Sequence, residues 1–290
     1  MGKRLLDLGI VIDYVLTHSI AKNKSLLERV FSEQYEKSDN GVVSVRDKRK
    51  ISAKSVQNPN DPDAEYRGKH KQKVKGFSTN ITETLPEKDK PSLITDVKVK
   101  GATAADNDFF EDAVTATREV TGDDVKTAYV DGAYQSQSNR DFGKDEEMNI
   151  VAGGLQGKPS RFDLNMTDAQ TLEVTDKTTG EVKTAIPVKP DKWKIDLVDA
   201  NGKKAYRYFS KEQVDRVEVR RKVDAIPFDE RKKRNNVEAA MFQYSFHTRN
   251  NKTRYRTLIK HSLQAIARCA WINMRRIFWF DCKLSLQMAK

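Results

Sequence analysis

Two neighbouring segments of the chain alternate apolar and polar residues, and this alternation constrains the fold more than any other pattern in the sequence. Residues 74–84 (VKGFSTNITET) place Ile81 on an apolar face, and residues 92–101 (SLITDVKVKG) place Thr95 and Val97 together on one face. The segment LPEKDKP between them has the turn formers of a hairpin loop. We therefore expect two adjacent strands joined by a hairpin.

Helical patterns flank this hairpin. Residues 4–34 repeat apolar residues three or four positions apart, which predicts helix, whereas residues 36–64 are polar and turn-rich, which predicts a connector. After the hairpin, Asp106 or Asn107 is expected to cap a helix that ends at Gly122.

Short strands and helices alternate in the second half. We expect a strand up to Asp131, a polar helix near residues 138–148 and a short strand at NIVAG. Residues 163–223 contain two hairpin patterns, one around an Asn201-Gly202 turn, and predict a β-rich insertion. Two helical patterns follow, and the last one carries Ile259, Leu263, Ile266, Ala270, Met274 and Ile277 at helical spacing.

This order predicts one α/β layer domain with an insertion. We expect a helical segment and polar connector at residues 1–60 and the first part of the α/β domain at 61–162. The β-rich insertion occupies 163–223, and basic helices at 224–290 complete the domain.

One segment carries the whole excess of positive charge. The chain has 53 Lys and Arg against 42 Asp and Glu, and the stretch from Arg231 to Arg276 holds 12 of these cations with a single acid, Glu238. Such a block attracts a polyanion because it neutralises phosphates and releases their counterions. The cations are interleaved with Tyr244, Phe246, Tyr255 and Trp271. This pattern favours nucleic-acid binding over the alternative, a solvated basic helix face.

The sequence does not indicate a membrane protein. Its longest apolar stretch, LGIVIDYVL, is short and contains Asp13, whereas a spanning helix needs about 20 apolar residues. Cys269 and Cys282 fit no zinc-site spacing and are expected to be buried thiols. We therefore expect a cytoplasmic protein.

Two carboxylates are candidates for function. Asp131 is either a turn former, because Asp-Gly favours a hairpin turn, or a metal ligand at the end of a strand, where Gly132 would permit close approach. Glu238 neighbours an apolar stripe, so we expect it at the edge of the buried face of its helix. Arg234 lies one turn earlier on the same side, and an ordinary ion pair between them is the simplest interpretation.

Five stretches occur in a characteristic order: NPNDPDAEYRGKHKQKVKGFSTNITET, SLITDVKVKGATAADNDFFEDAV, AYVDGAYQS, RNNVEAAMFQYSFHTRNNKTRYRTLIKH and ARCAWINMRRI. Together they resemble the catalytic domain of bacterial insertion-sequence transposases of the DDE type. They are spread over residues 52–280, and their order and spacing make the resemblance specific.

The resemblance implies a ribonuclease H-like mixed sheet with flanking helices. It also implies a DNA transposase that hydrolyses phosphodiesters and transfers strands at insertion-sequence ends. In that family three acids hold two Mg²⁺ or Mn²⁺ ions, which activate the attacking oxygen and stabilise the leaving oxygen. By resemblance, Asp131 is the second of these catalytic metal ligands and Glu238 is the third.

The resemblance also implies the partners. Arg234 matches an arginine that contacts DNA near the cleaved phosphate, and the further expected DNA-binding residues are Lys252, Arg254, Arg256 and Lys260. Double-stranded DNA, as transposon end and as target, is the expected partner. A homodimer is the expected active form, located at the bacterial nucleoid.

The first acid of the family is not found in its expected strand. Asp13 lies on a helical pattern, and Asp61 and Asp63 lie in a turn. We therefore expect an inactive, N-terminally truncated transposase. The alternatives are a non-catalytic nucleic-acid-binding protein that uses residues 231–276 and a β-rich interaction protein with a basic tail.

Overall fold

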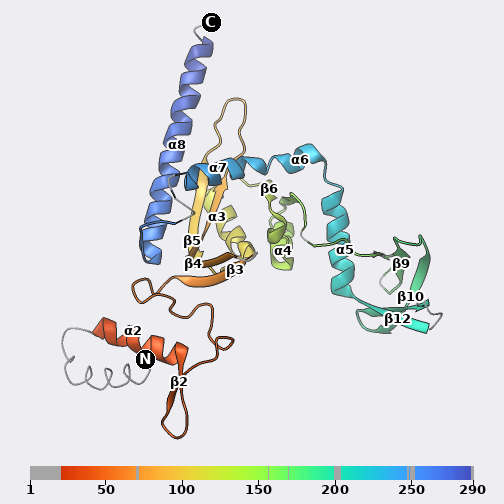
Figure 1. The fold of residues 1–290 in the computed structure, drawn as a ribbon. Coiled ribbons are helices and arrows are strands. Elements are labelled where there is room, and N and C mark those ends of the chain that lie inside the picture. The colour runs from red at the N-terminus through yellow and green to blue at the C-terminus, as the bar shows by residue number, and fades with distance from the viewer. Residues whose placement is uncertain are drawn as a thin grey trace. The chain divides into compact units, whose positions relative to one another are not determined.

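The chain divides into two compact units, the first comprising Met1–Asp124 with Asn236–Lys290 and the second comprising Val125–Asn235. Their elements are drawn in Figure 1. The computed structural model describes residues 21–69, 72–155, 157–168, 170–198, 204–246, 248 and 252–288.

A three-stranded antiparallel sheet forms the centre of the first unit. Its strands are β3 (Glu65–Lys69), β4 (Gln72–Glu83) and β5 (Ile94–Gly101), in the order β3-β4-β5. The predicted hairpin is confirmed, because β4 pairs with β5 and Ile81 lies opposite Val97. Thr95 and Val97 were predicted to share a face of the sheet, but the register shifts near Thr82 and they do not. Thr95 hydrogen-bonds to Thr117 on α3, whereas Val97 packs towards α8.

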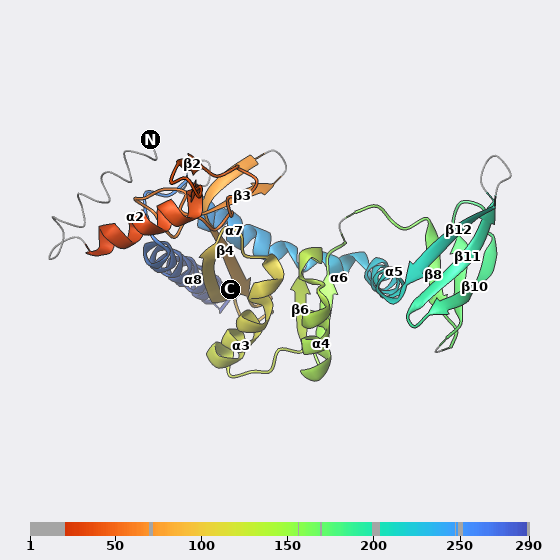
Figure 2. The same ribbon diagram turned by 90° about the horizontal axis from the view of Figure 1, so that it is seen from below.

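Helices cover both faces of this sheet (Figures 1 and 2). They are α3 (Phe110–Thr121), α7 (Asn235–Ser245) and α8 (Leu258–Met288). On one face the sheet shares a buried cluster with α7 and α8, made of Ile81, Ile94, Ala240, Cys269 and Ile272. On the other face, Lys98 and Lys100 lie 3.9 and 3.6 Å from Asp112 of α3. Successive side chains of a strand point to opposite faces of the sheet, so Val97 and Lys98 lie on different faces. The helices α3 and α8 therefore cover opposite faces of the sheet.

The ends of α3 follow the sequence only in part. Gly122, with φ of 73°, ends the helix as predicted. The predicted cap at Asp106 or Asn107 is wrong, because a 3-10 turn, η1 (Asp106–Phe109), precedes α3 and is capped at Ala105. The Ala105 N–H donates to the carboxylate of Asp108, 3.1 Å away.

The apolar residues predicted for α8 do not face the sheet. Ile259, Leu263, Ile266, Met274 and Ile277 are all exposed, whereas Ala265, Cys269 and Ile272 are buried. Small side chains at positions 265 and 269 let the helix approach the sheet closely, so packing has selected a different face of α8. Cys269 is buried as predicted, while Cys282 is only half-buried.

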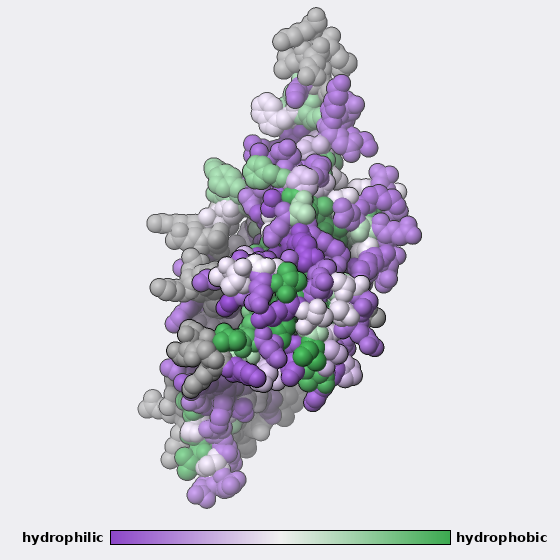
Figure 3. Space-filling model, turned by 90° about the vertical axis from the view of Figure 1, so that its right-hand side faces the viewer, coloured by the Kyte–Doolittle hydropathy of each residue, from purple (hydrophilic) through white to green (hydrophobic). Residues whose placement is uncertain are grey.

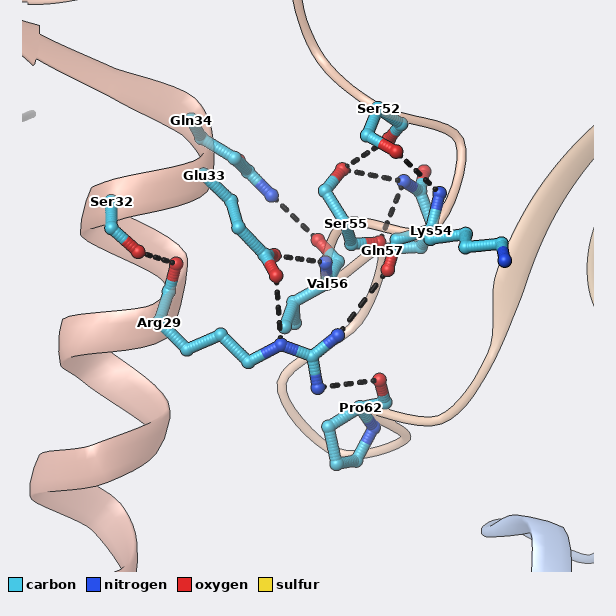
Figure 4. Close-up of polar contacts among 10 residues, drawn as sticks. All are labelled: Arg29, Ser32, Glu33, Gln34, Ser52, Lys54, Ser55, Val56, Gln57 and Pro62. Carbon is cyan, nitrogen blue, oxygen red and sulfur yellow. Dashed lines mark hydrogen bonds and ion pairs between the residues drawn. The ribbon is translucent and has the colours of Figure 1, made fainter.

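The N-terminal part of the first unit begins with α2 (Ala21–Gln34), and residues 4–20 of the predicted helix lie outside the described residues. The predicted connector contains a small hairpin of β1 (Tyr35–Lys37) and β2 (Val43–Val45). Figure 4 shows how α2 holds the chain that follows. Arg29 donates to the carbonyls of Lys54 and Pro62, and the carboxylate of Glu33 accepts from the Val56 N–H at 2.7 Å.

The second unit begins with a parallel pair of strands, β6 (Thr127–Val130) and β7 (Asn149–Ala152). The helix α4 (Gln137–Asp145) connects them. Its N-cap is Ser136, whose hydroxyl accepts from the Asn139 N–H. The predicted strand, polar helix and short strand are therefore all confirmed.

A five-stranded antiparallel sheet follows, in the order β12-β11-β10-β9-β8. Its strands are β8 (Phe162–Met166), β9 (Leu172–Asp176), β10 (Val182–Lys189), β11 (Lys192–Val198) and β12 (Lys204–Ser210). The two predicted hairpins are β9–β10 and β11–β12, and the Asn201-Gly202 turn lies outside the described residues. One face of the sheet buries Trp193 and Leu172.

The helix α5 (Lys211–Asp224) packs on this sheet through Val214 (Figure 2). Most of α5 lies within the predicted β-rich insertion, because the charged residues around the helix weaken its apolar periodicity. A capping box was the available signal: the Ser210 hydroxyl accepts from the Gln213 N–H, and the Gln213 side chain accepts from the Ser210 N–H. The short helix α6 (Phe228–Lys232) follows.

In the space-filling view of Figure 3, apolar groups are interspersed with hydrophilic ones. Val182, Ile186 and Val188 of β10 are exposed apolar residues. Among the residues that the structure describes, none of the helices combines the length and the apolarity of a membrane-crossing segment.

The predicted α/β class is confirmed. The described strands form four sheets, of two, five, three and two strands. The ribonuclease H-like arrangement stays a prediction.

Candidate functional site

Asp131 follows β6 directly and caps the short 3-10 turn η2 (Gly132–Tyr134). Its Oδ1 accepts from the Gly132 N–H at 2.7 Å, and its carbonyl oxygen accepts from the Tyr134 N–H at 3.0 Å. Because β6 and β7 are parallel, their carboxyl ends lie at one edge of the pair. The predicted position at a strand end is confirmed, and one carboxylate oxygen forms the turn.

Gly132 lies in close contact with the chain that follows β7. A Cβ atom at this position would lie 2.0 Å from the carbonyl oxygen of Gly154. The chain that leaves β7 therefore fills the space beside Gly132, and only a residue without a side chain fits there. Gly132 therefore permits close approach, here of the Gly154 carbonyl oxygen, and its role beside a metal ligand stays a prediction.

Arg234 lies at the same edge, with its Nη1 3.8 Å from Oδ2 of Asp131. A Cβ atom at Gly153 would lie 3.0 Å from the Arg234 Nε, so the guanidinium runs closely over the end of β7. The Asp131 side chain is 53% exposed and that of Arg234 is 26% exposed. An ion pair this exposed contributes about 1 kcal/mol or less.

A hydrogen-bonded cluster next to this edge fixes α6 to β6. The Tyr129 hydroxyl donates to Glu230 at 2.7 Å, and the Lys233 ammonium donates to Glu230 at 2.7 Å and to the Tyr129 oxygen at 3.3 Å. Burial and the Glu230 hydrogen bond raise the pKa of Tyr129, and Lys233 lowers the pKa of Glu230. The cluster positions Arg234, the residue after Lys233.

The sequence pattern does not reveal this cluster, because Glu230 lies just outside the basic block. The carboxylate of Glu230 neutralises Lys233. The charge count of the basic block from Arg231 to Arg276 includes Lys233 as a cation but does not include Glu230. The signal was the spacing of Glu230 and Lys233, three residues apart, which brings the two side chains together on one face of a helical turn.

Glu238 lies on α7 in the first unit and is exposed. The expectation that it borders the buried face is wrong. Ala240, only two positions later, is completely buried. Side chains two positions apart on a helix differ by about 200° in direction. Glu238 therefore points away from the core of the first unit.

The other predicted DNA-binding residues lie together before and within the first turn of α8. Lys252, Arg254, Arg256 and Lys260 are all exposed. Two aspartates of the connector bind the same chain segment: Asp61 accepts from the Thr257 N–H at 2.8 Å and Asp63 accepts from the Leu258 N–H at 3.1 Å. These carboxylates satisfy backbone donors at the start of α8.

Among the described residues, no group of three or more His, Cys, Asp or Glu side chains could hold a metal ion. Arg234 is a cation beside Asp131, Asp61 and Asp63 are bonded to the start of α8, and Asp13 lies outside the described residues.

Comparison of the chain with protein-family models, with curated proteins and with solved structures finds no significant match. The resemblance to DDE transposases therefore stays a prediction from the stretches quoted from the sequence.

Proposed function

We propose that this chain is a protein of the DDE transposase type that binds double-stranded DNA. The basic block supports the proposal, and the observation that carries it is the segment 252–260. This segment presents four cations to solvent beside Tyr255, which is 51% exposed. Exposed cations on one short segment can contact successive phosphates of a DNA backbone.

Asp131 and Glu238 are proposed as two of the three acids that hold Mg²⁺ or Mn²⁺ in such proteins. The bound ions would supply electrophilic assistance to phosphodiester displacement. The first acid of the family is not found in its expected strand, so the activity proposed for this chain is DNA binding without cleavage. Arg234 is proposed as a phosphate contact near Asp131.

Salt-dependent binding tests the DNA-binding segment. Substituting glutamine at Lys252, Arg254, Arg256 and Lys260 is expected to weaken binding of a short duplex. It should also reduce the slope of log K against log salt by about 0.9 for each phosphate that the variant no longer neutralises. A matched control changes four exposed cations of the connector to glutamine, namely Lys48, Arg49, Lys50 and Lys54. Equal effects of the two quadruple changes would contradict the assignment.

Nicking of supercoiled plasmid in Mn²⁺ tests the catalytic part. We expect binding without nicking. Nicking that is abolished by Asp131→Ala and by Glu238→Ala, but not by the exposed control Asp145→Ala, would show that a third ligand completes the site.

Metal dependence of DNA binding separates the transposase type from a simple nucleic-acid-binding protein. In the first case Mn²⁺ strengthens binding, and Asp131→Ala or Glu238→Ala removes that gain. In the second case neither the metal nor the two substitutions changes the affinity.

A further inference from the structure

A groove with a volume of about 650 Å³ lies on the first unit between α7 and α8. The groove is not evident from the sequence pattern. Its walls include Phe242 and Phe246 of α7 and Trp271 and Trp279 of α8. Each of these four residues is more than half exposed, at 51–66%. Large apolar side chains gathered on an exposed surface mark an interaction site.

The same groove is lined by cations. They are Arg268, Arg275, Arg276 and Lys283. Among the described residues that line it, Glu83 is the one acid, and its Oε2 lies 2.6 Å from Nη1 of Arg276. Glu83 is almost completely buried, at 4% side-chain exposure, so this pair belongs to the floor of the groove. Arg275 and Lys283 are exposed and give the groove a positive surface.

The aromatic side chains offer separate stacking faces. Trp271 and Trp279 are eight positions apart on α8, which is about 12 Å along the helix axis. The rings of Phe242 and Phe246 are one turn apart on α7, with centroids 5.9 Å from each other in an edge-to-face arrangement. Neither tryptophan belongs to the buried cluster of the sheet, and both are more than half exposed, so each offers ring surface to a ligand.

We propose that this groove binds single-stranded DNA. The surplus of cations favours a polyanion, and unpaired bases stack on exposed aromatic side chains, whereas a duplex keeps its bases stacked on each other. The inference rests on the proposed function in taking DNA as the partner. It adds that part of the DNA is held as an unpaired strand, at a place distinct from the segment 252–260.

Tryptophan emission provides a direct test with the full chain. The chain has three tryptophans, and Trp193 is only 4% exposed in the core of the second unit. Quenching of the tryptophan fluorescence by a short oligothymidylate therefore reports binding close to Trp271 and Trp279. We expect the oligothymidylate to quench this fluorescence. We also expect the fluorescence anisotropy of a labelled oligothymidylate to rise when the protein binds it. Trp271→Ala and Trp279→Ala should each weaken binding about tenfold, the scale of one base stack.

The matched control is Tyr208→Ala on β12, an aromatic residue 57% exposed and outside the groove, which should leave binding unchanged. Circular dichroism confirms that each variant is folded. A single-stranded probe that does not bind, or that binds without quenching and with equal affinity for the tryptophan variants, would overturn the inference. The inference would also be overturned if polyglutamate bound as tightly as the oligothymidylate and its binding were weakened equally by Trp271→Ala and Trp279→Ala.

A duplex probe in the same assay keeps the two proposals apart. Duplex binding that depends on residues 252–260 while the single strand fails to bind would overturn only the groove. Single-strand binding that depends on Trp271 and Trp279 while the duplex fails would overturn only the proposed duplex binding.

Discussion

Oδ1 of Asp61 accepts a hydrogen bond from the backbone N–H of Thr257, 2.8 Å away and 196 positions later in the chain. Thr257 has a φ of 72°, a conformation that a β-branched residue rarely adopts. Asp63 accepts from the next N–H, that of Leu258. The two aspartates thus fasten the connector to the start of α8 and hold Thr257 in its unusual conformation.

Asp61→Ala and Asp63→Ala are each expected to destabilise the first unit by about 1 kcal/mol, because each leaves a backbone N–H at a helix start without its acceptor. Urea unfolding followed by circular dichroism measures the change. The control is Asp39→Ala, an exposed aspartate in the turn between β1 and β2. Unchanged stability of both variants, with altered metal binding, would instead favour these residues as ligands.

Arg276→Met is expected to destabilise the first unit by about 3–5 kcal/mol, because it leaves the buried carboxylate of Glu83 without its cation. Its neighbour Arg275 is exposed, so Arg275→Met should change the unfolding free energy by about 0.5 kcal/mol or less. Adding Glu83→Gln to Arg276→Met should recover part of the loss. Similar stabilities of the two single variants would show that the Glu83 pair contributes little.

Gly132→Ala is expected to destabilise the second unit by about 1–3 kcal/mol, because the new methyl group would overlap the carbonyl oxygen of Gly154. Gly154→Ala is the matched control, since a Cβ atom there meets no other atom within 4 Å. Thermal unfolding of the two variants checks the difference. A neutral Gly132→Ala would mean that the turn after Asp131 adjusts easily.

The ion pair of Arg161 and Asp176 predicts an acid-sensitive contribution to the stability of the second unit. Arg161 lowers the pKa of Asp176 from its usual 3.8 to about 2. The folded state therefore favours the ionised carboxylate. This stabilisation is complete above about pH 4 and is lost as the pH falls towards about 2.

Between about pH 5 and pH 2, the free energy of unfolding measured with urea should fall more steeply for the native chain than for Asp176→Asn. The asparagine cannot titrate at this position. Arg161→Gln removes the cause of the lowered pKa and should flatten the profile in the same range. Parallel profiles for all three proteins would contradict the prediction.

Local patterns in the sequence were sufficient for the hairpin of β4 and β5, for the end of α3 at Gly122 and for the strand that leads to Asp131. Each depends on residues close together in the chain: the alternation of side chains, or the freedom of glycine to adopt a positive φ. The helix α5 was missed because charged residues surround it and only its capping box marks where it begins.

The candidate site depended on more distant contacts. The sequence identified Asp131 at a strand end, and Arg234 as a cation of interest, but it did not relate Arg234 to Asp131 or Gly132 to Gly154. The contact of Arg234 with Asp131 joins the end of β6 to a segment about a hundred residues away. Gly132 and Gly154 lie closer in the chain, and they meet because β6 and β7 pair. Glu238 was placed wrongly because periodicity alone does not say which side of a helix another element covers.

The sequence by itself determined the α/β class, the hairpins and the basic block between Arg231 and Arg276, since all three follow from composition and short-range periodicity. Tertiary packing decided which face of α8 is buried, because the sheet accepts the small residues Ala265 and Cys269 at close range and leaves the face that carries Leu263 and Ile266 in solvent. It also placed the aromatic residues of α7 and α8 around one groove, a proximity that depends on how two helices cross.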